Sequence, residues 1–268
     1  MENPGPLDSQ VVVIIGGTTG IGLAAAHACL AAGAAGVVVT GRNEVSATAA
    51  QSALGPKSAI HVGDAVDGDH AERAIALAVE RFCRFDALYH VAGGSGRKFG
   101  DGPLHEVTDA GIDATLNLNL ASIIRSNRAA VRRFLQDGRG GAMLNMGSVL
   151  GFSPSPRFFA THVYAAAKSA IVGFTRSIAA YYAPQGIRAN VIAPALVETP
   201  MARRAAQEQT ILDFIATKQP LDGGRIGRPE DLDGAAVYLL SPAARFVTGQ
   251  VLAVDGGWTV SEGQYPAE

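Results

Sequence analysis

Two side chains that can exchange protons, Tyr164 and Lys168, stand four residues apart in the segment YAAAK. On a helix this spacing places both side chains on one face. An isolated tyrosine has a pKa of about 10 and is a poor acid or base at neutral pH, but a nearby ammonium stabilises the phenolate and lowers that pKa. The pair therefore predicts a general acid–base site. Because such pairs are frequent in ordinary helices, the prediction needs support from elsewhere in the chain.

A serine stands where it could assist that site. Ser148 follows the apolar segment 142–146, which is predicted to be a strand. Open parallel sheets bind their ligands beyond the carboxyl ends of the strands. The Ser148 hydroxyl could therefore hold a carbonyl or alcohol oxygen beside Tyr164, and an ordinary loop serine is the alternative.

A glycine-rich turn follows the first apolar segment, Val11–Ile15. Its spacing, G-x-x-x-G-x-G, differs from the usual dinucleotide fingerprint G-x-G-x-x-G. The physical basis is shared, because glycines allow a tight turn and the free amides of the next helix bind a pyrophosphate. A purely structural glycine turn is the alternative. The predicted pyrophosphate residues are Gly16, Thr18, Thr19, Gly20, Ile21 and Gly22.

Two charged residues at the ends of the next predicted strands bear on the choice of cofactor. Arg42 follows the second strand, 20 residues after Gly22. At this place an Asp or Glu binds the ribose of NAD, whereas an Arg suits the 2′-phosphate of NADP. Asp64, after the third strand, could accept a hydrogen bond from the adenine amino group. We therefore expect NADP(H), with NAD(H) possible; a solvated arginine and a turn aspartate are the alternatives.

The elements that must position these residues alternate along the whole chain. Short apolar runs, of which Val11–Ile15 is continuous and β-branched, predict strands, and longer helix-like stretches between them predict helices. The predicted strands are 11–15, 36–40, 59–62, 87–91, 142–146, 188–193 and 250–254. The predicted helices are 21–32, 44–54, 69–82, 109–135, 161–182 and 229–240.

This alternation is typical of βαβ units. It predicts an α/β fold, a Rossmann-type doubly wound sheet of seven parallel strands with helices on both faces. No linker or internal repeat divides the sequence, which predicts a single dinucleotide-binding and catalytic domain over residues 1–268. The less regular segment 196–228 is predicted to act as a flexible lid.

The composition argues against several classes of protein. There are 22 Lys and Arg against 24 Asp and Glu, a net charge of −2, whereas nucleic-acid proteins carry a basic face. The first apolar run has five residues and the N-terminal segment has no signal-peptide pattern, so we expect neither a membrane span nor secretion. The histidines show no metal-ligand spacing, and two cysteines make no disulfide framework. We expect a cytoplasmic protein that holds no metal and binds small molecules.

The order and spacing of the motifs resemble the short-chain dehydrogenase/reductase family, from about Val11 to Trp258. Several ordered motifs at compatible spacing are far more specific than any one of them. The segments that carry the resemblance are GGTTGIG (16–22), VAG (91–93), LNL around Asn119, NMGSV (145–149), YAAAK (164–168), IRANVIAP (187–194), GRPEDL (227–232) and TGQVLAVDGG (248–257).

The resemblance implies a role for each matching residue. Tyr164 would exchange the proton, and Ser148 would orient the substrate oxygen. Lys168 would bind the nicotinamide ribose and lower the pKa of Tyr164, while Asn119 would hold a water in a proton relay. The other implied cofactor contacts are Asp64 at the adenine, Ala92 and Gly93 at the adenosine ribose, and Pro194, Val197 and Thr199 at the carboxamide.

The family resemblance further implies an oxidoreductase that moves a hydride between nicotinamide and a carbonyl or secondary alcohol, assembled as a homotetramer, and Arg42 makes NADP(H) the expected cofactor. The alternatives are an NAD(H)-dependent alcohol dehydrogenase of the same fold and a dinucleotide-binding regulatory protein with little turnover. One departure from the family pattern is Ile15, where a threonine is common, so a side-chain hydrogen bond to the glycine turn is expected to be absent.

The sequence gives opposing hints about the substrate. An apolar rim is predicted from aromatic and methionine side chains near the site, and it favours a bulky or cyclic ketone. A cluster of cations could instead recognise an acid. The rim candidates are Phe152, Phe158, Phe159 and Met201, and the cations are Arg97, Lys98 and Arg157.

Overall fold

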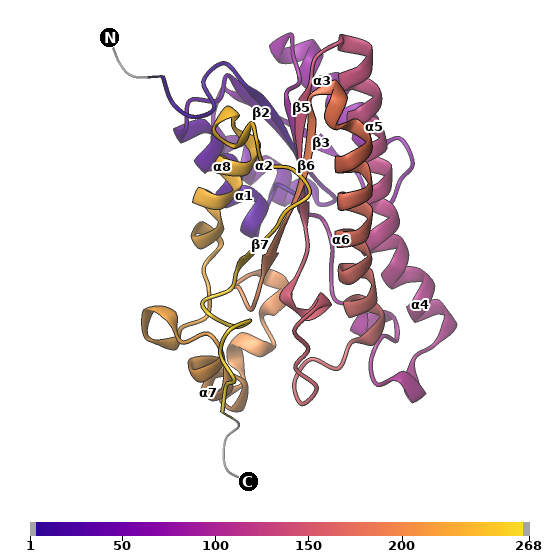
Figure 1. Cartoon of the computed structure of the whole chain (residues 1–268), viewed down its shortest axis with the longest axis vertical. Helices are drawn as coiled ribbons and strands as arrows, with labels where there is room; N and C mark the ends of the chain where they lie inside the picture. The colour runs from indigo at the N-terminus through magenta and orange to yellow at the C-terminus, as the bar shows by residue number, and fades with distance from the viewer. Residues whose placement is uncertain (1–3, 265–268) are drawn as a thin grey trace.

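The computed structural model describes residues 4–264, and at its centre is one sheet of seven parallel strands (Figure 1). The strands lie in the order β3-β2-β1-β4-β5-β6-β7. The doubly wound α/β fold is therefore confirmed, and every strand begins and ends within one residue of its predicted bounds. The strands are β1 (Val11–Ile15), β2 (Gly36–Gly41), β3 (Ser58–Val62), β4 (Ala87–His90), β5 (Gly141–Met146), β6 (Ile187–Pro194) and β7 (Val251–Val254).

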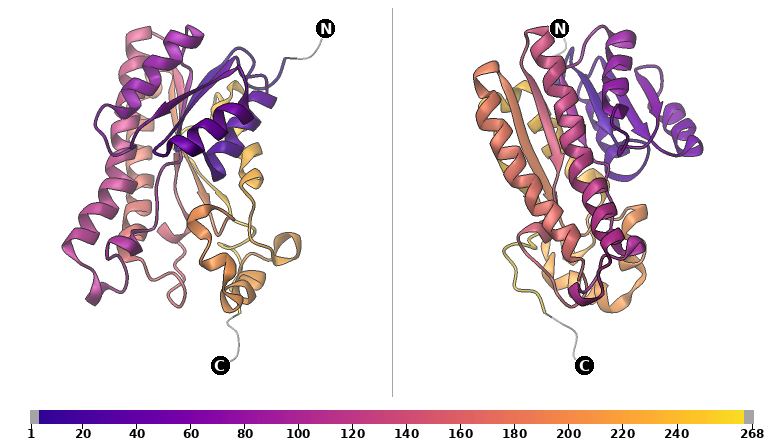
Figure 2. Two further views of the ribbon diagram at one scale, coloured as in Figure 1. Left: turned by 180° about the vertical axis from the view of Figure 1, so that it is seen from behind. Right: turned by 90° about the vertical axis from the view of Figure 1, so that its right-hand side faces the viewer.

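Helices cover both faces of the sheet (Figure 2). Val12 and Ile14 of β1 belong to a core with α1, α2 and α8, whereas Val11 and Val13 belong to a core with α3, α5 and α6. Burial on both faces explains why β1 is an unbroken run of β-branched residues. The helices are α1 (Gly20–Ala31), α2 (Glu44–Leu54), α3 (His70–Phe82), α4 (Asp109–Leu116), α5 (Ser122–Asp137), α6 (His162–Tyr182), α7 (Gln209–Lys218) and α8 (Asp233–Leu240).

The strand order reverses direction at β1, because β2 lies on one side of it and β4 on the other. The connections before and after this point therefore run over opposite faces of the sheet and leave a crevice at the carboxyl ends of the strands. Within residues 4–264, none of the helices combines the length and the apolar character that crossing a membrane requires.

The predicted helix 109–135 is interrupted. Between α4 and α5 the chain forms a π-helical turn, Asn117–Ala121. Within it, Nδ2 of Asn119 donates to the carbonyl oxygen of Thr115 at 3.0 Å, so a side chain occupies a backbone acceptor of the helix. The last predicted helix also differs, because it begins with a 3-10 turn, Pro229–Leu232, before α8.

The late segment 196–228 lies beyond the carboxyl ends of the strands, with α7 at its centre (Figure 1). Ile211 and Phe214 of α7 pack with Trp258, which is 1% exposed, in a small separate core. The indole nitrogen of Trp258 donates to the carbonyl oxygen of Ser153 at 3.2 Å, which ties this core to the loop after β5. Movement of the segment as a lid stays a prediction.

Candidate active site

A cavity of about 500 Å³ lies at the carboxyl ends of the strands. It extends from the glycine turn after β1 past the ends of β4, β5 and β6 to the late segment. All the predicted site residues except Gly22 and Asn119 line it. Residues far apart in the sequence, such as Gly16 and Thr199, are thus brought to one site.

The glycine turn leaves the first amides of α1 open to an anion. Gly16 and Gly20 have φ angles of +87° and +53°, which side chains disfavour. The first turn of α1 has no acidic residue, and Thr19 makes no side-chain capping bond. A Cβ at Gly22 would lie 2.1 Å from the carbonyl oxygen of Gly16, so this glycine serves close packing. The geometry fits a pyrophosphate at the helix N-terminus.

A hydroxyl on a neighbouring strand supports this turn. The amide of Gly16 donates to Oγ1 of Thr40 at 3.2 Å, and the amide of Gly17 donates to the carbonyl oxygen of Thr40 at 2.8 Å. Ile15 itself offers no side-chain hydrogen bond to the turn, as expected, but the turn is not left without one. Thr40 of β2 supplies one from the adjacent strand.

The two residues expected to contact the adenosine half of the cofactor also contact each other. Nη1 of Arg42 lies 3.3 Å from Oδ2 of Asp64, and the side chains are 62% and 32% exposed. Both line the cavity. A Cβ at Gly41 would lie 2.2 Å from Oγ1 of Thr18, so Thr18 fills that side of Gly41 and a phosphate beside Arg42 would have to lie elsewhere.

Ser148 and Tyr164 meet in the cavity, as the sequence predicted. Ser148 follows β5 and caps a 3-10 turn, because its Oγ accepts from the amide of Leu150 at 3.2 Å. Tyr164 is in the first turn of α6. Burial raises the pKa of Tyr164 above its ordinary value, and a hydrogen bond with Ser148 opposes that rise by lowering the pKa.

Lys168 lies beside Tyr164 but is turned toward the sheet. Its Nζ donates to the carbonyl oxygen of Met146 at 2.8 Å and lies 5.5 Å from the centre of the Tyr164 ring. The side chain is 2% exposed, and burial lowers the pKa of Lys168 to about 7. We predicted that Lys168 lowers the pKa of Tyr164, whereas here burial of the phenol dominates. The ammonium that should act on the phenol is itself partly discharged by burial.

Asn119 holds the loop after β4 rather than facing the cavity. Its Oδ1 accepts from the amide of Gly94 and its Nδ2 donates to the carbonyl oxygen of Gly94, both at 3.0 Å. A Cβ at Gly93 would lie 2.9 Å from Oδ1 of Asn119 and 3.5 Å from Nζ of Lys168, so only glycine fits between them. The two hydrogens of the Asn119 amide already bind backbone oxygens, and its place in a proton relay stays a prediction.

Asp101, which no sequence pattern singled out, fixes the start of α6. Its Oδ1 accepts from the amide of Val163 at 3.1 Å, and its Oδ2 accepts from the amide of Tyr164 at 2.9 Å. The residue is 3% exposed. A carboxylate at a helix N-terminus is favourable because it binds free amides and the positive end of the helix dipole. Since Asp101 is 62 residues from Val163, no local motif reveals the contact.

The far wall of the cavity is apolar with two cationic side chains. Of the four predicted rim residues, Phe159 and Met201 line the cavity, whereas Phe152 and Phe158 do not. Leu150 and Trp258, which were not predicted, line it too.

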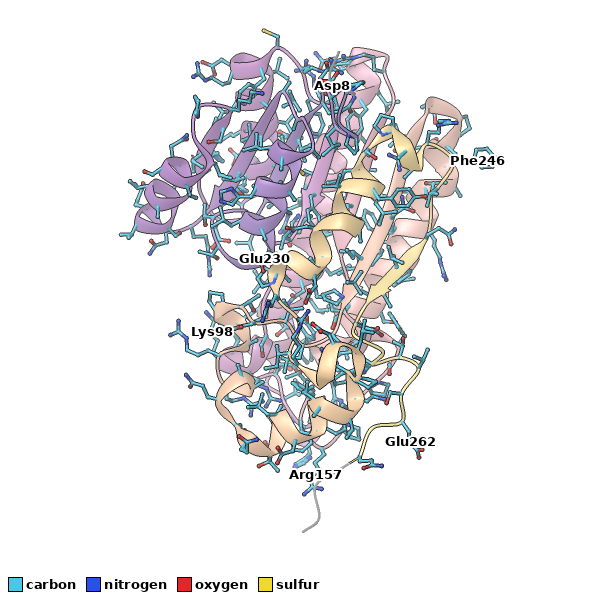
Figure 3. The ribbon with its side chains drawn as sticks, turned by 90° about the vertical axis from the view of Figure 1, so that its left-hand side faces the viewer. Asp8, Lys98, Arg157, Glu230, Phe246 and Glu262 are labelled. Carbon is cyan, nitrogen blue, oxygen red and sulfur yellow. The ribbon has the colours of Figure 1, made fainter. Side chains whose placement is uncertain are left out.

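Among the predicted cations only Arg97 lines the cavity, and Arg204, which we had not considered, joins it. Lys98 and Arg157 lie on the outside of this half of the molecule (Figure 3), over the rings of Phe99 and Phe158.

Known proteins resemble this chain over nearly its full length. A family model described as Enoyl-(Acyl carrier protein) reductase matches residues 16–259. The A-factor type gamma-butyrolactone 1'-reductase (1S-forming) of Streptomyces virginiae is 34% identical, covering 97% of this chain and 99% of that protein. The cis-4-hydroxycyclohexanecarboxylate dehydrogenase of Sinomonas cyclohexanicum is also 34% identical, covering 93% and 96%. A solved short-chain type dehydrogenase/reductase from Mycobacterium ulcerans superposes with a TM-score of 0.87 at 28% identity, covering 96% and 92%.

Proposed function

Because the chain belongs to the short-chain dehydrogenase/reductase family, we propose that it is an NADP(H)-dependent ketone reductase or alcohol dehydrogenase with Tyr164 as general acid and base. Membership makes it an oxidoreductase of alcohol and carbonyl groups that uses NAD(P)(H). The observation that carries the finer proposal is the meeting of Tyr164 and Ser148 in the cavity that also contains the glycine turn.

In this mechanism Ser148 and Tyr164 hold the substrate oxygen by hydrogen bonds. Tyr164 gives its phenolic proton to that oxygen during reduction and takes a proton back during oxidation. The nicotinamide, when bound, supplies or accepts the hydride. Asp101 holds the amides at the start of α6 and thereby fixes the backbone of Tyr164.

The remaining predicted site residues would hold the cofactor. The first amides of α1 would bind the pyrophosphate, and Ala92 and Gly93 would contact the adenosine ribose. Lys168 would bind the nicotinamide ribose and help to return a proton to Tyr164, while Asn119 would hold the relay water. Thr18, Thr19 and Ile21 would complete the pyrophosphate site, and Pro194, Val197 and Thr199 would border the carboxamide.

The preference for NADP(H) rests on Arg42. Its guanidinium is exposed at the end of β2, and a charge-assisted hydrogen bond to a phosphate favours binding by about 1.5–3 kcal/mol. The Asp64 carboxylate opposes this preference, because it already pairs with Arg42 and would repel a phosphate. The ion pair between Arg42 and Asp64 therefore supports the alternative cofactor, NAD(H).

We propose a cyclic ketone or secondary alcohol as the substrate. The apolar wall formed by Leu150, Phe159 and Trp258 suits a hydrocarbon ring better than a sugar. The relative from Sinomonas cyclohexanicum is named for a hydroxylated cyclohexane, which supports the same class.

The remaining features of the proposal concern the whole chain. We propose one domain in which segment 196–228 closes over the substrate. Exposed apolar side chains such as Phe246 support assembly as a homotetramer (Figure 3). The free thiols of Cys29 and Cys83 are compatible with the reducing cytoplasm, where we propose that the protein works.

An activity screen tests the function. Cyclic ketones and alcohols are each assayed with both nicotinamides, with Tyr164→Phe as the matched variant. We expect turnover that falls at least 100-fold in this variant while cofactor binding is kept. Binding of the cofactor without turnover of any substrate would favour the regulatory-protein alternative instead.

A further inference from the structure

Two arginines from distant parts of the chain face the cavity that contains Tyr164. Arg97 belongs to the 3-10 turn Gly96–Phe99, which follows β4. Arg204 lies in the late segment, between two 3-10 turns that precede α7. Both side chains line the cavity, next to the apolar wall described above.

Arg97 is an exposed side chain whose guanidinium is anchored at one nitrogen. Its Nη2 donates to the carbonyl oxygen of Phe158 at 3.2 Å, and a guanidinium has five N–H donors in all. Partial removal of the guanidinium from water lowers the pKa of Arg97, and the charge of Arg204 lowers it further. Both arginines line the same cavity and both stay charged, so an anion bound there would relieve their mutual repulsion.

The carboxylates near the two arginines leave Arg97 without an ion-pair partner among the described residues. Asp101 lies close enough to favour the charge of Arg97, but its two oxygens accept from amides of α6. Glu208 pairs with Arg204 at 3.1 Å on the exposed side of the segment, where the side chains are 46% and 54% exposed. Such surface pairs contribute little. Among residues 4–264, no carboxylate forms an ion pair with Arg97.

We propose that Arg97 and Arg204 form a subsite for a carboxylate of the substrate, which is therefore an oxo acid or hydroxy acid with an apolar ring between its two polar ends. The proposal rests on the proposed function and narrows its substrate class. Apolar side chains would contact the ring, Tyr164 and Ser148 would hold the reacting oxygen, and the arginines would bind the carboxylate by charge-assisted hydrogen bonds.

The test compares acids with neutral partners of the same shape. The probes are 3- and 4-oxocyclohexane-1-carboxylate and their methyl esters, assayed with NADPH. We expect the acids to have the higher kcat/KM. Arg97→Met and Arg204→Met should each lower kcat/KM for the acids by roughly 10- to 100-fold, mainly through KM, and leave the esters nearly unchanged.

Neighbouring cations that do not line the cavity provide matched controls. Lys98→Met and Arg203→Met remove a positive charge one residue away and should leave the acid-to-ester ratio as in the parent protein. Activity on the esters reports that each variant is folded.

Three results would overturn the subsite. The arginine variants could lower activity on acids and esters equally, they could raise KM for NADPH instead, or the parent protein could show no preference for acids. In each case turnover of the esters would leave the proposed function standing. If the parent protein turned over neither the acids nor the esters, the proposed function itself would be contradicted.

Discussion

Burial of Lys168 predicts an unusual pH dependence of stability in the cofactor-free protein. Its pKa is about 7 in the folded chain and 10.5 for an ordinary lysine. Between these values the unfolded chain holds the Lys168 proton and the folded chain has released it. Stability must therefore rise with pH in this window, by up to about 1.4 kcal/mol per pH unit. This gain in stability is lost again as the pH falls toward 7, where Lys168 becomes protonated in the folded chain as well.

The size of the change in the free energy of unfolding depends on the range of pH over which it can be measured. Between pH 7 and 8.5 Lys168 should add about 1–2 kcal/mol to the free energy of unfolding. Above pH 9 another group works in the opposite direction. Burial raises the pKa of Cys29 from 9.0 to about 12, so the unfolded chain loses this proton first and stability falls. The measurement must therefore stay below pH 9.

Urea unfolding of the parent protein and of Lys168→Met isolates the lysine. The difference between their free energies of unfolding should change by about 1–2 kcal/mol from pH 7 to 8.5, because the other titrating groups are common to both. Lys57→Met, at an exposed lysine, should run parallel to the parent protein. Parallel curves for Lys168→Met would refute a buried lysine with a lowered pKa.

Four further results are expected. Tyr164→Phe should lower kcat at least 100-fold with KM for NADPH nearly unchanged, and a variant with a tenth of the parent activity would contradict its role as acid. Asp101→Ala should lower the free energy of unfolding by about 1–3 kcal/mol, measured by urea unfolding, because two partly buried amides lose their acceptor. Arg42→Ala should lower kcat/KM for NADPH roughly 10- to 100-fold with little change for NADH, whereas Asp64→Asn, which can keep its bond to the amide of Val66, should strengthen the NADPH preference. Light scattering at micromolar concentration should give the mass of a tetramer, and a monomer would reject that assembly.

The sequence predicts well those features that depend on neighbours along the chain. β1 and β2 are short β-branched runs because helices cover both faces of the sheet, and this pattern is visible without a structure. The turn from Gly16 to Gly22 and the pair Tyr164 and Lys168 are likewise local, and the structure brings them to one cavity.

Features that depend on distant partners escape the sequence. The break between α4 and α5 accompanies hydrogen bonds of Asn119 to Gly94, 25 residues away. Thr40 supports the glycine turn only because β2 pairs with β1. The clash that a side chain at Gly41 would have with Thr18 is equally a matter of packing. An aspartate at position 41 would meet Thr18, so Arg42 and Asp64 are the positions at which to change the cofactor preference.

The positive side chains of the cavity are not free cations in the ligand-free protein, and this affects which ligands the cavity selects. Arg42 is paired with Asp64, Lys168 is partly discharged by burial, and Arg97 is opposed by Arg204. In the free protein, therefore, Arg42 is neutralised by a carboxylate, Lys168 has partly lost its proton, and Arg97 and Arg204 repel each other. A ligand with negative groups beside Arg42 and at Arg97 and Arg204 is favoured by these charges, whereas a neutral ligand of the same shape is not. The charges of cofactor and substrate, more than their shapes, should therefore decide which molecules this cavity accepts.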